Sequence, residues 1–217
     1  MPDKNAVLVT RPAYDPPTHY LCFWSESVIK VAKEKGLKVI DLRDKEAKRE
    51  ILERHLEKND PRLVVFNGHG TGDCITGFRK DHILVLAGEN ETILKERITC
   101  AISCNCAKKL GPDSIRAGAT AFVGFKGKFA LLHGEWNSAT PRRDKTAAYF
   151  LDPAYAVPIS LIKGNSVGEA FEKSQFAFDK SIQYFETHYT PENSHILTWL
   201  RYNKAIQAVC GNTSAHL

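Results

Sequence analysis

The sequence predicts an α/β domain, a three-layer α/β/α sandwich with a mostly parallel central sheet. Short apolar runs alternate along the chain with amphipathic stretches, which is the pattern of strands connected by helices. The apolar runs are continuous rather than alternating, as is typical of parallel strands buried on both faces. The chain has 217 residues, of which 43% are hydrophobic, so it can form one substantial core without a stabilising metal or disulfide.

The first half of the chain supplies the clearest elements. Residues 6–10 are apolar and end at Arg11-Pro12, which predicts a first strand. Residues 20–35 carry apolar side chains at helical spacing and stop at Gly36, which predicts a helix. Residues 37–40 predict a second strand. Residues 44–58 combine many charges with one apolar face, which predicts an amphipathic surface helix.

Further strands follow in the middle of the chain. Residues 63–66 predict a third strand, and residues 83–86 predict a hairpin or an edge strand. Residues 98–103 and 119–125 predict two more core strands, the second of them preceded by Gly118.

From about residue 145 the pattern becomes helical. Residues 169–187 and 194–209 predict two long helices, separated by Thr190-Pro191. The sequence contains neither an internal repeat nor a linker of the kind that divides domains. Residues 1–217 are therefore expected to form a single domain with a helical C-terminal segment from about residue 166.

Composition excludes several classes of function. The 30 basic residues exceed the 25 acidic ones by 5 but are scattered, so direct binding of nucleic acid is not expected. No segment approaches the roughly 18 uninterrupted apolar residues of a membrane helix, and the N-terminus lacks a signal-peptide core. We therefore expect a cytoplasmic protein without membrane contact. The six cysteines are then free thiols rather than three disulfides.

His69 and Cys104 are the candidate catalytic residues. Each lies just beyond an apolar run, residues 63–66 for His69 and residues 98–103 for Cys104. The carboxyl ends of neighbouring parallel strands meet at one edge of a sheet, which is where ligands bind in such folds. A thiol and an imidazole brought together there form a nucleophile and its proton partner. This placement predicts a cysteine peptidase.

The chemistry needs further groups around this pair. A free thiol has a pKa near 8.5, so an imidazole must take its proton and later protonate the leaving amine. Residues 105–111 are expected to begin a short helix, whose N-terminus would favour the thiolate. The backbone N–H groups of Gly70 and Cys104 are the predicted oxyanion donors, because glycine lets the backbone approach a substrate closely.

Other uses of the same residues remain open at this point. Gly68-His69-Gly70 could be a tight turn around a structural histidine, and Cys104 could be a buried packing residue. Cys100, Cys104 and Cys106 could bind zinc together with His69, although Cys-x-x-Cys knuckles are absent. Cys106 could instead be a resolving thiol. We expect no metal and no cofactor.

At these residues the sequence resembles the caspase-like cysteine peptidases, a group that includes caspases, gingipains, separase and bacterial CHAT domains. Residues 66–70 resemble the family's His-Gly block, and residues 101–107 with Leu110-Gly111 resemble its nucleophile block, with Cys104 in the nucleophile position. Residues 117–124 resemble the glycine-alanine turn and strand that follow. Residues 144–150 and 164–170 resemble the CHAT-type tail, although residues 125–128 lack its Trp-containing run. The resemblance implies a caspase-haemoglobinase fold and endopeptidase activity.

The resemblance also implies sites for substrate selection. Asp144 lies where several relatives place an acidic residue that binds a basic side chain of the substrate residue before the scissile bond. Arg11 follows the first strand, where caspases hold an arginine that reads acidic substrates. The two residues point to opposite preferences, with Asp144 the favoured candidate, and surface charge is the commoner role for such residues. Arg142-Arg143 lies in a polar stretch, residues 134–145, which is either a loop cut during activation or an uncleaved surface loop.

The expected partners are a protein or peptide substrate and a regulatory protein. The alternative function is a catalytically inactive interaction module that docks through its two C-terminal helices.

Overall fold

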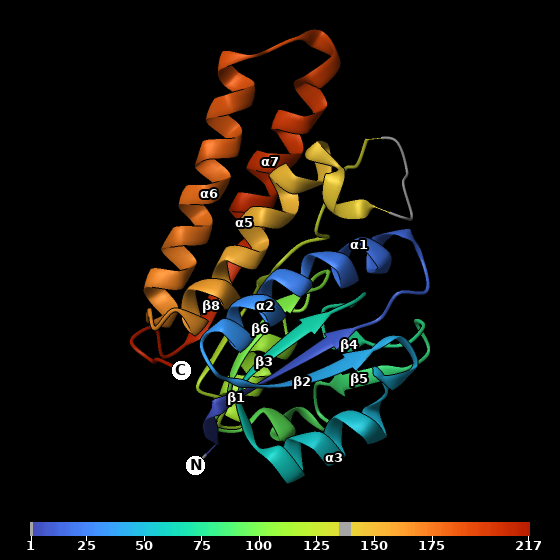
Figure 1. The fold of residues 1–217 in the computed structure, drawn as a ribbon, viewed down its shortest axis with the longest axis vertical. Helices are drawn as coiled ribbons and strands as arrows, with labels where there is room; N and C mark the ends of the chain where they lie inside the picture. Colours follow the sequence, from blue (N-terminus) through green and yellow to red (C-terminus); the bar gives the residue numbers. More distant parts are fainter. Residues whose placement is uncertain (1, 135–139) are drawn as a thin grey trace.

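The computed structural model describes residues 2–134 and 140–217. A six-stranded sheet with the order β2-β1-β3-β6-β7-β8 forms its centre (Figure 1). The strands are β1 (Asp3–Arg11), β2 (Lys38–Arg43), β3 (Pro61–Asn67), β6 (Ile98–Ile102), β7 (Ala121–Phe125) and β8 (Gln207–Gly211). All neighbours pair in parallel except β7 and β8, which are antiparallel.

Helices cover both faces of this sheet, so the predicted three-layer α/β/α sandwich is confirmed. On one face lie α1 (Pro16–Trp24), α2 (Glu26–Glu34) and α5 (Lys145–Ile162), which share one apolar cluster with the strands. On the other face lie α3 (Arg49–Asn59) and α4 (Leu110–Arg116), which contribute to a second cluster.

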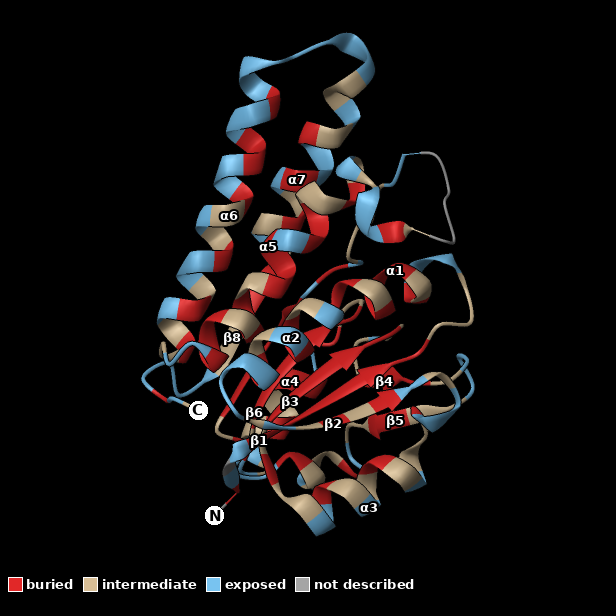
Figure 2. Ribbon diagram, in the orientation of Figure 1, coloured by how far each residue is buried: buried red, intermediate tan, exposed pale blue. Residues whose placement is uncertain are grey.

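The central strands are buried from end to end. Every residue of β6 and β7 is buried, and β3 is buried except at Arg62 (Figure 2). This explains why the corresponding apolar runs in the sequence are continuous, since neither face of these strands meets water.

Two predicted helices have different limits in the structure. The stretch 20–35 contains the end of α1, which begins earlier at Pro16, and the whole of α2. The two helices are joined at the buried Ser25, whose hydroxyl donates to the carbonyl of Cys22 at 2.8 Å. The stretch 44–58 begins as a short 3-10 helix, Asp44–Glu46, and α3 itself starts at Arg49. In both places, local side-chain and turn geometry interrupts a periodicity that is continuous in the sequence.

The C-terminal segment contains more than helices. α6 (Val167–Thr187) and α7 (Ser194–Ile206) pack with α5 around their own apolar cluster. The predicted second helix was expected to reach Val209, but it ends at Ile206, and residues 207–211 form β8 instead. The edge of β7 offers backbone groups that need partners, so pairing with it outweighs continuation of the helix.

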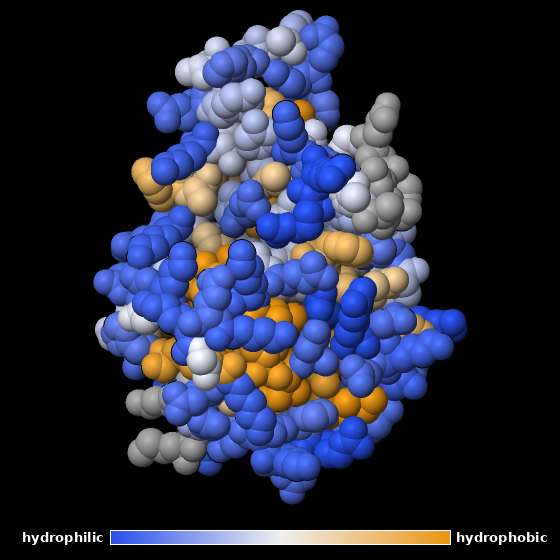
Figure 3. Space-filling view, viewed as in Figure 1, coloured by the Kyte–Doolittle hydropathy of each residue, from blue (hydrophilic) through white to orange (hydrophobic). Residues whose placement is uncertain are grey.

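A small antiparallel hairpin of β4 (Cys74–Thr76) and β5 (Ile83–Leu86) lies outside the main sheet, as the prediction of a hairpin at residues 83–86 allowed. Figure 3 shows apolar side chains gathered over the β2 region between α2 and α3, on a face that is otherwise mostly polar. None of the helices formed by the described residues has the length and hydropathy needed to cross a membrane.

Candidate active site

The backbone register of β3 and β6 brings His69 and Cys104 together. Asn67, the last residue of β3, pairs with Ile102, the last residue of β6. His69 and Cys104 each lie two residues beyond this pair, so they leave the sheet at equivalent positions. Both line one cavity of about 290 Å³. The structure therefore places the two residues at the same rim of the sheet.

Gly70 holds the two strand ends close to each other. A Cβ atom at this position would lie 2.3 Å from Ser103 Oγ, 2.7 Å from the carbonyl oxygen of Cys74 and 3.0 Å from that of Cys104. Two of these atoms belong to fixed backbone, so they have little freedom to move aside. A glycine is required here because the His69 turn packs directly onto the Cys104 turn.

The end of β3 is anchored by a buried polar network. Asn67 is fully buried, and its side-chain amide donates to the carbonyl of Thr10 at 2.7 Å. The Tyr155 hydroxyl donates to the Asn67 side-chain oxygen and to the carbonyl of Leu21 at 2.9 Å. This network ties β3 to β1, α1 and α5 just before His69, so it fixes the backbone from which the imidazole projects.

The imidazole of His69 contacts a carboxylate that sequence reasoning missed. His69 Nε2 lies 2.7 Å from Asp15 Oδ2, and both side chains are about a quarter exposed. With the Nε2 proton directed at Asp15, Nδ1 is the nitrogen left free to accept a proton.

Asp15 is also the N-cap of α1. Its side chain accepts from the Thr18 backbone N–H at 3.0 Å and takes part in a capping box with Thr18. Burial by itself would raise the pKa of Asp15, but the hydrogen bonds from Thr18 and His69 outweigh it and hold that pKa below its usual value. The sequence did contain a local signal, Asp15-Pro16-Pro17-Thr18, which is typical of a helix start.

The surroundings of Cys104 favour the protonated form of its thiol. Partial burial raises its pKa, while the backbone N–H of Phe129 and the charge of Lys128 lower it by less. The expected helix directly after Cys104 is absent, because α4 begins only at Leu110 and Asn105 adopts a left-handed conformation with a φ of 58°. The favourable charge near the sulfur therefore comes from the segment after β7 rather than from a helix N-terminus.

Both predicted oxyanion donors are free of protein partners among the described residues. The hydrogen bonds on either side of Gly70, from Thr71 N–H to Cys74 and from Thr76 N–H to His69, leave the Gly70 N–H unpaired. The Cys104 N–H likewise makes no hydrogen bond within the described part of the chain, whereas the next N–H, of Asn105, donates to Gly127. Ser103, 2% exposed, lines the cavity too, and its hydroxyl has no hydrogen-bond partner among the residues that the structure describes.

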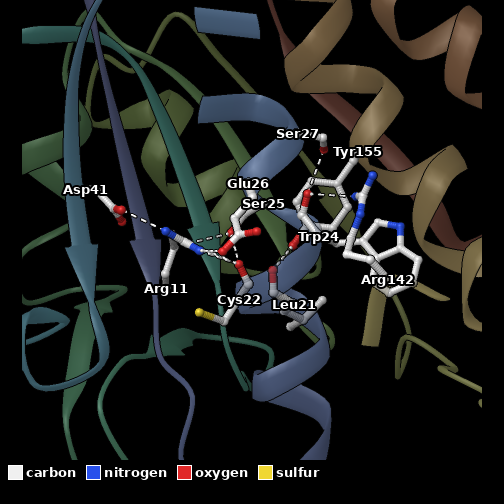
Figure 4. A network of polar contacts seen from close by, with 10 residues as sticks. All are labelled: Arg11, Leu21, Cys22, Trp24, Ser25, Glu26, Ser27, Asp41, Arg142 and Tyr155. Atoms are coloured by element: carbon white, nitrogen blue, oxygen red, sulfur yellow. Dashed lines mark hydrogen bonds and ion pairs between the residues drawn. The ribbon is translucent and has the colours of Figure 1, made fainter. Parts of the chain in front are cut away.

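Arg11 lies away from this cavity, inside a buried polar cluster (Figure 4). It is 3% exposed, and its guanidinium donates to the carbonyl of Cys22, to Ser25 Oγ at 3.1 Å, to Asp41 at 2.7 Å and to Glu26 at 2.9 Å. These bonds fasten the junction of α1 and α2 to the edge of the sheet. The structure therefore does not bring Arg11 to a position where it could read a substrate side chain.

Asp144 also has structural partners and does not line the cavity. It is the N-cap of α5, with Oδ1 accepting from the Ala147 N–H at 2.9 Å. Its Oδ2 accepts from the Tyr20 hydroxyl at 2.7 Å and from the Gly134 N–H at 3.0 Å.

The polar stretch that contains Arg142-Arg143 is only partly described. Arg142 and Arg143 belong to a short 3-10 helix, and the guanidinium of Arg142 lies 5.0 Å from the ring centre of Trp24. Residues 135–139 of the stretch lie outside the described residues.

The other thiols lie in different surroundings. Cys22, Cys74, Cys100 and Cys106 are buried, and only Cys210 is partly exposed like Cys104; all six are free. Burial raises the pKa of Cys106 to about 12. Across residues 2–134 and 140–217, no three His, Cys, Asp or Glu side chains are grouped so that they could hold a metal ion.

Comparisons with known proteins identify the fold. No family model and no curated protein matches the sequence. The structure is similar to that of the Arg-specific cysteine proteinase gingipain R, with a TM-score of 0.66 and 12% identity over 99% of this chain and 48% of that one. It is also similar to a complex of the pro- and mature domains of RgpB from Porphyromonas gingivalis, with a TM-score of 0.63 and 9% identity over 98% of this chain and 48% of that one.

A third structure, described only as a protease, has a TM-score of 0.58 and 16% identity over the whole of this chain and 49% of its own. The chain thus spans about half the length of these neighbours. At these identities the similarity shows the fold, which is the caspase-haemoglobinase fold of the gingipain neighbours.

Proposed function

We propose that this protein is a cysteine endopeptidase in which Cys104 is the nucleophile and His69 its proton partner. The observation that carries the proposal is the shared cavity at the carboxyl edge of the sheet, where the β3–β6 register sets the two residues at equivalent positions. The fold shared with cysteine proteinases supports the same reaction class.

The proposed reaction proceeds in two stages. Cys104 Sγ attacks the carbonyl carbon of the scissile bond while its proton passes to His69 Nδ1, giving a tetrahedral oxyanion. That oxyanion accepts hydrogen bonds from the Gly70 and Cys104 N–H groups, one of which is typically worth about 3 kcal/mol in the transition state. Collapse breaks the C–N bond, and the His69 proton moves to the leaving amine. Water then hydrolyses the thioester, releasing the acid and restoring the thiol.

The raised pKa of Cys104 decides how the attack begins. Because burial raises the pKa of Cys104 and so favours the protonated thiol, the proposed attack removes the proton in the same step, with the help of a general base. His69 and Cys104 form no hydrogen bond with each other in this structure, and catalytic hydrogen bonds often close only when a substrate is bound. Asp15 would then hold the imidazole in the required tautomer and stabilise its charged form, as the third member of a triad does.

The regulatory partner expected from the sequence remains part of this proposal. One structural neighbour is a complex of a pro-domain with its mature domain, which offers a precedent for control by a protein segment. The six free thiols agree with a reducing compartment, so we propose action in the cytoplasm.

Native-state thiol labelling of the chain tests the nucleophile. Four cysteines are buried, so Cys210 is the matched control for Cys104, because both are partly exposed and both have a pKa raised by burial. We expect limiting iodoacetamide to alkylate Cys104 faster than Cys210, and His69→Ala to remove the difference without changing Cys210. Cys104→Ala should abolish cleavage of a denatured protein substrate. Equal labelling of the two cysteines, unaffected by His69→Ala, would favour the inactive interaction module.

A further inference from the structure

The cavity beside Cys104 has mainly apolar walls. Pro17 and Leu21 of α1 form one side, Ile102 lies at the end of β6, and Phe129 and Leu131 come from the segment after β7. From these walls we infer that the cavity binds an apolar side chain of the residue that precedes the scissile bond. This inference rests on the proposed peptidase function and names its substrate class.

The position of Cys104 determines which substrate side chain enters the cavity. The carbonyl that Cys104 attacks belongs to the residue before the cut, so that residue's side chain branches from the atom next to the reacting carbon. His69 and Cys104 line the cavity together with the apolar residues. When the carbonyl carbon of a substrate contacts Cys104 Sγ, the side chain of the residue before the scissile bond therefore lies at the opening of the cavity.

The charges around the cavity disfavour a basic side chain. Among its described lining residues there is no carboxylate, and the charged side chain that they include is Lys128, which is exposed. The nearby carboxylate of Asp15 is bound by His69 and Thr18, and that of Asp144 by Tyr20, Gly134 and Ala147. An arginine or lysine side chain would leave water without gaining a counter-ion and would meet the like charge of Lys128.

An acidic side chain is the competing occupant, because it could reach Lys128. The cavity walls disfavour an acidic side chain, because five apolar residues surround the space that its carboxylate would occupy. Arg11, the guanidinium expected to read acidic substrates, has its donors committed to the α1–α2 junction. At about 290 Å³, the cavity has room for one medium-sized side chain such as Leu, Met or Phe.

The test uses fluorogenic peptides that differ only in the residue before the cut: Leu, Phe, Arg and Asp. We expect kcat/KM for Leu or Phe to exceed that for Arg and Asp by roughly 100-fold, as for discrimination by a pocket of the wrong polarity. Peptidyl chloromethyl ketones with the same four side chains, followed by mass spectrometry of Cys104, give an independent reading.

A carboxylate introduced into the wall should reverse the preference. We expect Leu131→Asp to raise the Arg-to-Leu ratio of kcat/KM at least tenfold. Because Leu131 also packs against the core, Pro17→Asp is the second variant: Pro17 is exposed in the first turn of α1, where an acidic residue is favourable. Phe176→Asp, at an exposed site on α6, is the matched control and should leave the ratio unchanged.

The outcomes separate the two proposals. Preferential cleavage after Arg or Asp, or equal labelling by all four chloromethyl ketones, overturns the apolar pocket and leaves the peptidase intact. If no peptide is cleaved and no ketone labels Cys104, both the peptidase and its pocket are overturned.

Discussion

His69 Nε2 and Asp15 Oδ2 lie 2.7 Å apart, although 54 positions separate the two residues in the chain. The carboxylate caps α1, and the imidazole follows β3, so the first helix after β1 is tied to the candidate catalytic turn. The Asp15 side chain therefore has two roles: it starts α1, and it orients the proposed general base.

Asp15→Asn separates these two roles. Asparagine caps helices about as well as aspartate, so α1 should form, but the amide cannot stabilise a charged imidazole. We expect kcat to fall by roughly 100-fold or more while binding of substrate changes little. Ser166→Ala is the control, because Ser166 caps α6 with a capping box of the same kind far from the site. Wild-type kcat in Asp15→Asn would show that the carboxylate only caps α1.

The same carboxylate predicts a pH dependence of stability. Because the folded-state pKa of Asp15 is lowered, its contribution is complete above the unfolded value of about 3.9 and is lost as the pH falls through the lower folded value. Urea unfolding of wild type and Asp15→Asn should therefore differ most near neutral pH and converge in acid. A difference that grows in acid would contradict the assigned direction.

Gly70→Ala tests the close packing of the two turns. The added methyl group meets Ser103 Oγ and two backbone carbonyls at 3.0 Å or less, so the turns must separate. We expect a loss of about 1–3 kcal/mol in the free energy of unfolding and a large fall in activity. Gly72→Ala is the control, since the nearest atom to its Cβ is Lys108 Cβ at 3.9 Å. Equal effects of the two substitutions would show that the close contacts at Gly70 do not determine the loss of stability.

Lys128 and Lys126 form a reciprocal pair of tests for the two accessible thiols. The charge of Lys128 lowers the pKa of Cys104, and that of Lys126 lowers the pKa of Cys210. At pH 8, below both raised values, Lys128→Gln should slow alkylation of Cys104 by about 2- to 5-fold and leave Cys210 unchanged. Lys126→Gln should do the opposite. Raising the pH should accelerate both reactions; a Cys104 rate independent of pH from 7 to 9 would contradict the raised pKa.

Arg11→Met should damage stability and leave substrate preference unchanged. Its removal takes the guanidinium partner from Asp41 and Glu26 and leaves the carbonyl of Cys22 with only the Ser25 hydroxyl as donor among the described residues, so we expect a loss of about 3 kcal/mol in urea unfolding. Arg201→Met is the control, because its ion pair with Glu186 is exposed and is worth less than about 1 kcal/mol. A stable Arg11→Met protein with an altered substrate preference would show that Arg11 does contact the substrate.

The sequence predicted the sheet and the placement of His69 and Cys104 at one edge of it, because both depend on local patterns. Buried parallel strands produce uninterrupted apolar runs, and their carboxyl ends can be counted residue by residue. Asp15 escaped prediction because its contact with His69 depends on how the first helix crosses the sheet edge, which periodicity does not encode. Arg11 and Asp144 were predicted to bind substrate from their positions in the sequence alone. Their structural partners, Cys22 and Asp41 for Arg11 and Tyr20 for Asp144, are brought to them only by the fold.

Strand β8 was missed for a related reason. Residues 194–209 have helical spacing throughout, and only the presence of an unpaired β7 edge makes an extended conformation preferable for the last of them. Likewise, the charge near Cys104 was expected from the following helix, but Lys128 and Phe129 supply it from another part of the chain.

The β3–β6 register has a consequence for protein engineering. The spacing between positions 69 and 104 is set by main-chain hydrogen bonds, from Leu63 opposite Ile98 to Asn67 opposite Ile102, and not by the two candidate side chains. Both side chains can therefore be exchanged without moving their attachment points. The scaffold is suited to housing other nucleophile and base combinations, such as serine with histidine or selenocysteine with histidine, whose reactivities could be compared on one unchanged frame.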